Sequence, residues 1–112
     1  MTKPFHYSIR PKADKTTIDL SGEINAQADQ DLQTAYTEAE SSAPSTIVLN
    51  FREVSYINST GIALIVGLMA RARKAHRTLA VYGLSEHYLE IFQITRLADF
   101  IKIYVDEASV VV

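Results

Sequence analysis

Apolar and polar residues alternate near the start of the chain. In residues 16–21, Ile18 and Leu20 alternate with polar side chains, which is the period-two pattern of a strand with one solvent-facing side. Residues 5–10 are also rich in β-branched and aromatic side chains, and a short polar stretch separates the two segments. The pattern predicts an antiparallel hairpin whose second strand ends at Gly22.

Three later segments have the spacing of helices. Between residues 26 and 41, apolar side chains recur near i, i+4, i+7, i+8 and i+11, and a loop that contains a proline follows. A second helical pattern starts in the polar segment at Asn58 and runs to about Arg77. A third helix is predicted for residues 86–94, with Ser85 as its N-cap.

Apolar runs between these helices predict buried strands. Residues 46–51 are almost continuously apolar, which is typical of a strand that is covered on both faces and central in a partly parallel sheet. A turn is expected next, at residues 52–53, before the segment 54–57 leads into the second helix. Residues 78–82 and 100–104 predict two further strands.

The order of these elements, β-β-α-β-α-β-α-β, predicts an α/β fold. Its mixed sheet should have about five strands, with an initial antiparallel hairpin and three to four helices. One domain over residues 1–112 suits this length, and the tail at 106–112 fits either a helical turn or a short strand. Seven residues are predicted to lie in the core: Ile47, Leu49, Phe51, Leu64, Leu68, Leu79 and Val81.

Composition and charge narrow the classes of function. Apolar residues make up 47% of the sequence and charged residues 21%, as in ordinary folded domains. A net charge of −2 gives no reason to expect nucleic-acid binding. The basic cluster in residues 71–77 is assigned to a helix C-terminus, where cations complement the helix dipole. The lack of cysteine excludes disulfides and thiolate chemistry.

The sequence predicts neither export nor membrane insertion. Its first residues lack the apolar core of a signal peptide, so a cytoplasmic protein is expected. The longest apolar run, residues 62–70, is less than half of the roughly 20 residues that a helix needs to cross a bilayer. This run is therefore expected to form a core helix.

The most distinctive motif is Asn58-Ser59-Thr60-Gly61, between a predicted strand and a predicted helix. Asn and Ser are good N-caps, worth about 1 kcal/mol. Capping leaves Gly61 unexplained, because glycine costs a helix about 1 kcal/mol relative to alanine. A hydroxyl at a helix N-terminus can also carry a phosphate, since the free amides and the dipole favour negative charge there. The motif therefore predicts either a simple cap or a phosphorylation site.

Two motifs resemble those of the STAS domains, a family named for sulfate transporters and anti-sigma-factor antagonists. Residues 20–25, Leu-Ser-Gly-Glu-Ile-Asn, are similar to the family's Leu-x-Gly-Glu-Leu-Asp turn. Residues 47–61 are similar to its central strand and phosphorylation loop, and the resemblance covers essentially the whole chain. Asn58 and Asn25 stand where the family commonly has Asp, so position 58 keeps its capping role without the charge.

This resemblance implies an anti-sigma-factor antagonist. In that family the unmodified protein binds an anti-sigma factor that is also a serine kinase, and phosphorylation of the serine matched by Ser59 switches binding off. A phosphatase is a further expected partner, and Thr60 is the backup acceptor. The predicted partner-binding surface consists of Asn58, Ser59, Thr60, Gly61 and Ile62, together with Gly22, Glu23 and Asn25.

Two other classes of function stay open. A STAS-like accessory subunit of a transport or signalling complex would use the same surface without phosphorylation, because the helix after Gly61 is apolar around most of its circumference. An enzyme has no supporting pattern, since the chain lacks a Gly-x-Ser-x-Gly elbow and a glycine-rich phosphate loop. No catalytic residue, cofactor or metal is therefore predicted.

Overall fold

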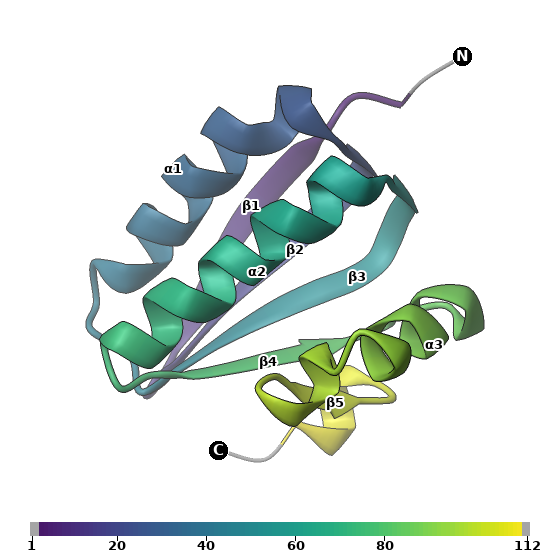
Figure 1. Cartoon of the computed structure of the whole chain (residues 1–112). Helices are drawn as coiled ribbons and strands as arrows, with labels where there is room; N and C mark the ends of the chain where they lie inside the picture. Colours follow the sequence, from purple (N-terminus) through teal and green to yellow (C-terminus); the bar gives the residue numbers. More distant parts are fainter. Residues whose placement is uncertain (1–2, 111–112) are drawn as a thin grey trace.

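The strands of the sheet lie side by side in the order in which they occur along the chain (Figure 1). The computed structural model describes residues 3–110. The strands are β1 (His6–Lys12), β2 (Lys15–Ile24), β3 (Thr46–Ile57), β4 (Thr78–Tyr82) and β5 (Lys102–Tyr104). The helices are α1 (Asp29–Glu40), α2 (Ser59–Lys74) and α3 (Glu86–Ile94), with short 3₁₀ helices η1 (Ala26–Ala28), η2 (Leu97–Asp99) and η3 (Glu107–Ser109).

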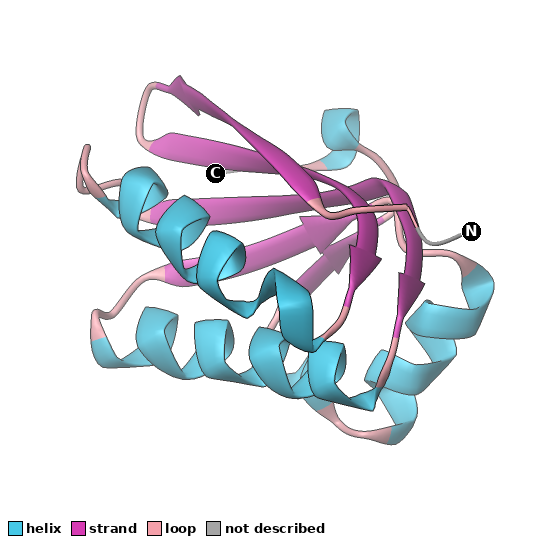
Figure 2. Ribbon diagram, turned by 90° about the horizontal axis from the view of Figure 1, so that it is seen from above, coloured by secondary structure: helices cyan, strands magenta, loops and turns pink. Residues whose placement is uncertain are grey.

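The predicted α/β fold is confirmed. β1 and β2 form the antiparallel hairpin, and the pairs β2–β3, β3–β4 and β4–β5 are parallel. Figure 2 shows α1, α2 and α3 along one side of the sheet and a short helical turn near the C-terminus on the other side. We call the side packed against the three α-helices the covered face and the opposite side the open face.

The main hydrophobic core lies between the covered face and the three helices. Ile18, Leu49 and Val81, from three neighbouring strands, are fully buried in it, together with Leu32 of α1 and Phe92 of α3. Six of the seven predicted core residues are buried as expected: Ile47, Leu49, Phe51, Leu68, Leu79 and Val81.

Leu64 is the exception among the predicted core residues. It is only partly buried and packs at the margin of the core, whereas its neighbour Ile65 is 1% exposed. The buried side of α2 contains Gly61, Ile65, Leu68 and Ala72, which follow one another at helical spacings of four, three and four residues. Because Gly61 faces the sheet, Leu64 lies to one side of this buried stripe.

The predictions that Gly22 ends a strand and that Arg52 and Glu53 form a turn are wrong. β2 continues through Gly22 to Ile24, and β3 continues through Arg52 and Glu53 to Ile57. The pairing of these two strands changes register twice near Gly22. Such irregularities take up extra residues and bend the strands without ending them, so the alternation of side chains is lost while pairing continues.

Helix ends also differ from the prediction by a few residues. The first helix begins as η1 and becomes α1 only at Asp29. α2 ends at Lys74 instead of near Arg77, because His76 adopts a left-handed backbone conformation with φ of 56°. The described part of the tail, up to residue 110, contains the helical turn η3, and residues 111–112 lie outside the described residues.

A small cluster and a polar network hold the open face. Three apolar residues are buried there and two more pack against them: Val48, Ala80 and Tyr82, then Tyr104 and Val110. Arg10 of β1 donates hydrogen bonds to Asp19 at 2.6 and 2.9 Å and to Glu107 at 2.8 Å. These bonds fasten η3 to the sheet, and the Arg10 guanidinium lowers the pKa of both carboxyl groups.

Candidate functional site

The side chain of Asn58 caps the start of α2. Its backbone is extended (φ −89°, ψ −177°), and its Oδ1 accepts a hydrogen bond from the Gly61 N–H at 2.8 Å. Its carbonyl oxygen accepts a hydrogen bond from the Ile62 N–H at 2.9 Å. Of the two caps that the sequence allowed, Asn58 therefore fills the role, and Ser59 is the first residue of the helix.

Ser59 and Thr60 lie in the first turn of α2, and both are exposed. Within residues 3–110 neither hydroxyl makes a hydrogen bond. The first N–H groups of a helix have no intrahelical acceptor, and the Asn58 cap satisfies only that of Gly61. The turn thus places two accessible hydroxyls beside two unsatisfied backbone amides.

Gly61 is buried because α2 starts in direct contact with the end of β2. A Cβ atom at this position would collide with the carbonyl oxygen of Ile24 and lie 2.9 Å from the Cγ2 atom of Ile57. The same Ile24 oxygen accepts a hydrogen bond from the Asn58 N–H at 3.3 Å. This close approach explains the glycine that capping left unexplained, and it brings the two sequence motifs together.

The residues at the end of β2 flank the start of α2. Gly22 is buried with φ of 84°, and a Cβ there would collide with the carbonyl oxygen of Pro4. Glu23 is partly buried, and its Oε2 atom has no hydrogen-bond partner within residues 3–110. Asn25 Oδ1 accepts a hydrogen bond from the Gln27 N–H at 3.0 Å and caps η1.

Apolar side chains continue from Ser59 along one side of α2. Ile62, Ala63 and Val66 follow it by three, four and seven residues, a spacing that places all four on the same side of a helix. Ile62 packs partly against the core, whereas Ala63 and Val66 are exposed. An accessible apolar surface therefore adjoins the Ser59 hydroxyl.

One residue that holds the site in place has no signal in the local sequence. The hydroxyl of Tyr88, on α3, accepts a hydrogen bond from the Ile57 N–H at 2.8 Å, and this tyrosine is buried. The contact joins α3 to the last residue of β3, immediately before Asn58. Because 31 residues separate the partners, no pattern along the chain predicts it.

The basic cluster at the other end of α2 is structural, as the sequence predicted. Arg71 and Lys74 lie in the last turn of the helix. Arg71 and Arg77 contact the carboxylate of Glu40 at 2.5 and 3.1 Å, which ties α2 to α1.

Within the described residues, no three His, Asp or Glu side chains gather into a group that could hold a metal ion. No helix in residues 3–110 combines the length and apolar character needed to span a bilayer.

The amino-acid sequence is similar to a family of known domains and to proteins of known role. The family model described as "Mlab, STAS domain" matches residues 8–104. An anti-sigma-B factor antagonist of Listeria monocytogenes is 31% identical over 90 residues, which cover 80% of this chain and 79% of the relative. The family-model match includes the Ser59 turn and the strands β2 and β3 that support it.

Solved structures share the fold. An anti-sigma factor antagonist from Mycobacterium paratuberculosis matches with a TM-score of 0.80 at 15% identity, covering 96% of this chain and 93% of that chain. The phosphorylated form of SpoIIAA, a Bacillus cell fate determinant, matches with a TM-score of 0.71 at 21% identity, covering 93% and 96%. These matches define a class of small α/β domains that includes antagonists of anti-sigma factors. The chain belongs to the STAS domain family.

Proposed function

We propose that this protein is a cytoplasmic anti-sigma-factor antagonist that is switched by phosphorylation of Ser59. The unmodified protein binds an anti-sigma factor that is also a serine kinase, and the phosphorylated protein does not. A phosphatase restores the binding form. The observation that carries the proposal is the exposed Ser59 hydroxyl, which is free of hydrogen bonds within residues 3–110 and stands at the N-terminus of α2 beside an apolar surface.

The local geometry suits a phosphate on Ser59. The Asn58 side chain already caps Gly61, so a modified Ser59 does not have to give up a structural hydrogen bond. The unsatisfied N–H groups of Ser59 and Thr60 and the positive end of the helix dipole favour an anion at this point. Phosphorylation adds a charge of about −1.5 to −2. The fold therefore tolerates the group while the surface presented to a partner gains negative charge.

The proposed docking surface joins Ser59 to the apolar side of α2. Ile62 and its exposed neighbours Ala63 and Val66 supply contact area, and Asn58 and Thr60 allow close approach of a partner. Gly61 is buried, so it contributes by letting α2 start against β2 and not by touching a partner. Glu23 and Asn25 flank the turn, and buried Gly22 acts through the shape of the backbone. A phosphate placed against an apolar interface weakens docking, because removing water from its negative charges costs free energy.

The central test is phosphorylation by an anti-sigma-factor kinase encoded in the same genome. The protein is incubated with this kinase and ATP, and wild type, Ser59→Ala and Thr60→Ala are compared by mass spectrometry. We expect one phosphate on wild type and on Thr60→Ala and none on Ser59→Ala. Equal modification of wild type and Ser59→Ala would exclude Ser59 as the acceptor, and loss only in Thr60→Ala would move the switch by one residue. A protein that binds its partner but is never modified would favour the accessory-subunit alternative.

A charged side chain in the apolar surface should block docking. Ile62→Glu is expected to weaken kinase binding at least about tenfold, because it leaves a carboxylate desolvated in the interface. Ile94→Glu is a matched control, since Ile94 is 72% exposed on α3 and lies outside the proposed surface. Affinities are measured by isothermal titration calorimetry on variants whose thermal unfolding is cooperative. Equal affinity for Ile62→Glu and the control would rule this surface out.

A further inference from the structure

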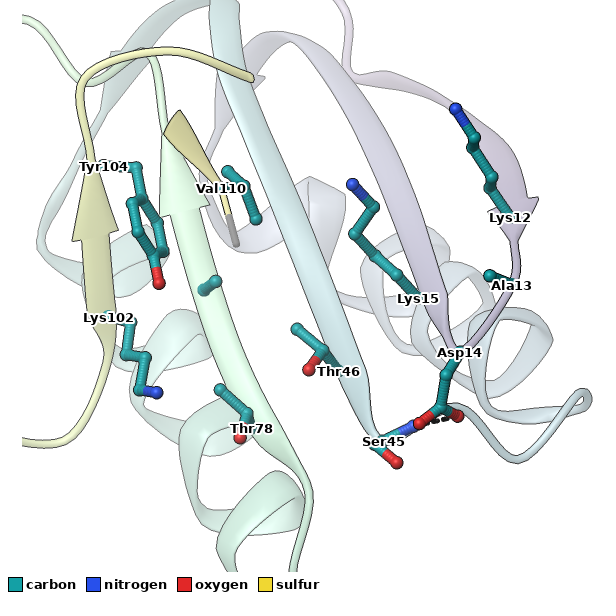
Figure 3. A pocket seen from close by; sticks show the side chains of 11 residues that line it. Lys12, Ala13, Asp14, Lys15, Ser45, Thr46, Thr78, Lys102, Tyr104 and Val110 are labelled. Atoms are coloured by element: carbon teal, nitrogen blue, oxygen red, sulfur yellow. Dashed lines mark hydrogen bonds between the residues drawn. The ribbon is translucent and has the colours of Figure 1, made fainter. Parts of the chain in front are cut away.

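A groove crosses the open face of the sheet at the end where β3, β4 and β5 begin (Figure 3). It encloses about 480 Å³, a size within the usual range for sites that bind small molecules. Ser59 lies elsewhere, because it follows the end of β3 and belongs to a helix on the covered face. The groove is therefore separate from the proposed switch.

The strand register builds this groove. Lys12 pairs with Lys15 across the hairpin, Lys15 pairs with Thr46, and Thr46 pairs with Thr78, which makes one row across four strands. Side chains at paired positions point to the same side of a sheet, so all four residues of this row lie on the open face. Lys102 of β5 joins them, paired with Ala80 two residues further along β4.

The middle of the groove is apolar, with hydroxyl groups at one end. Buried Ala80 lines it together with Tyr104 and Val110, which pack against the same small cluster. The hydroxyls of Thr46 and Thr78 make no side-chain hydrogen bond among residues 3–110, and Thr46 is only 5% exposed. A ligand could therefore place an apolar body against the floor and accept hydrogen bonds from its edge.

Positive charge surrounds this floor. Lys102 stands on one side, and Lys12 and Lys15 stand on the other (Figure 3). None of the three lysines forms an ion pair within residues 3–110, whereas the ion pairs that do form there use arginines. Among residues 3–110, Asp14 is the one carboxylate in the lining. Hydrogen bonding by the Ser45 side chain, and by the Ser45 N–H at 2.9 Å, lowers the pKa of Asp14.

We propose that this groove binds a small organic acid, that is, an anion with an apolar body. The unpaired lysines supply the attraction for the acidic group, and the surface between Ala80, Tyr104 and Val110 accepts the body. A volume of about 480 Å³ accommodates a ligand the size of a fatty or aromatic acid. This site does not depend on phosphorylation, so it adds a second point at which the protein can be controlled.

The test uses 8-anilinonaphthalene-1-sulfonate as the probe and its uncharged relative N-phenyl-1-naphthylamine as the comparison. Fluorescence titration of the full-length chain should give saturable binding of one sulfonate probe per protein at micromolar to millimolar concentration. The uncharged compound should bind at least about fivefold more weakly, because it lacks the group that the lysines attract. Equal binding of both compounds, or no saturable binding of the sulfonate, would overturn the proposal.

Variants locate the probe. Lys15→Gln and Lys102→Gln should each weaken sulfonate binding about threefold to fivefold, and the double variant more strongly. Lys74→Gln removes the same charge at the end of α2, outside the groove, and should leave binding unchanged. Thermal unfolding checks that each variant is folded. Unchanged affinity in the double variant would show that the probe binds elsewhere. Ser59→Ala should bind the sulfonate probe as wild type does. The groove proposal can therefore fail or succeed independently of the phosphorylation proposal.

Discussion

The two faces of the sheet are stabilised by different interactions. On the covered face, aliphatic and aromatic side chains of three strands meet those of α1, α2 and α3 in one continuous hydrophobic core. On the open face of residues 3–110, the buried apolar cluster consists of just Val48, Ala80 and Tyr82, and the Arg10 network holds the nearby turn η3. The difference indicates that the covered face supplies most of the folding free energy, because apolar burial is the dominant favourable contribution.

The same contrast separates the two candidate sites. Two contacts hold the Ser59 turn against the covered face. Gly61 packs against the backbone carbonyl of Ile24, and the Ile57 N–H donates a hydrogen bond to the buried hydroxyl of Tyr88. The lysine groove is made of side chains on the open face, at the margin of a small cluster. Substitutions in the groove should therefore change binding without changing the core, whereas substitutions beneath the Ser59 turn should affect stability first.

One identical change on each face measures the contrast directly. Val81 is buried in the core of the covered face and Val48 in the cluster of the open face, at 0% and 1% exposure. Val81→Ala should lower the free energy of unfolding by about 2 to 3 kcal/mol, because the cavity left in the dense core cannot collapse. Val48→Ala should cost about 1 to 1.5 kcal/mol. Urea titrations measure both, and equal costs would contradict the comparison.

A glycine pair in α2 tests how closely that helix must approach the sheet. Gly61→Ala should destabilise the protein by about 1 to 2 kcal/mol, because the new Cβ meets the carbonyl oxygen of Ile24. Gly67→Ala is the matched control, since no atom lies within 4 Å of a Cβ built there. This control should stabilise the protein by up to about 1 kcal/mol through helix propensity. If both changes stabilised equally, the seating of the Ser59 turn would not depend on the contact.

The Arg10 network should make the stability contributed by the open face depend on pH. Arg10→Gln removes the hydrogen bonds that lower the pKa of Asp19 and Glu107 and should cost about 1 kcal/mol at neutral pH. A depressed carboxyl pKa stabilises the fold above the ordinary values of 3.8 and 4.5, and the contribution is lost as the pH falls below them.

The stability difference between wild type and Arg10→Gln should therefore narrow as the pH falls from 6 towards 3, as measured by thermal unfolding across this range. Arg96→Gln is the control, because it removes an ion pair between an arginine that is 79% exposed and Asp99. It should change stability by less than about 0.5 kcal/mol at any pH. A constant difference for Arg10→Gln across the range would show that the network does not hold the open face.

Much of the fold was predictable because it follows from local periodicity. The alternation at Ile18 and Leu20 and the apolar run from residue 46 are properties of single strands, and the helical spacings identify α1, α2 and α3. Element ends were less predictable. Gly22 and residues 52–53 looked like breaks, yet pairing between β2 and β3 carried both strands through them. Pairing between distant segments overrides a weak local preference.

At the candidate site, the types of side chain could be read from the sequence, whereas their placement follows from contacts between distant segments. The order of Asn58, Ser59 and Thr60 before an apolar run already identified a helix start with either a cap or a phosphorylation site. Only the folded chain shows that the Ile24 carbonyl lies where a Cβ of residue 61 would stand and that the Tyr88 hydroxyl meets the Ile57 N–H. The row of lysines and threonines likewise forms only when four strands pair, so no single segment of the sequence reveals it. Periodicity reports how each segment divides between core and solvent, whereas the contacts between segments depend on register and close packing, which arise only when distant residues meet.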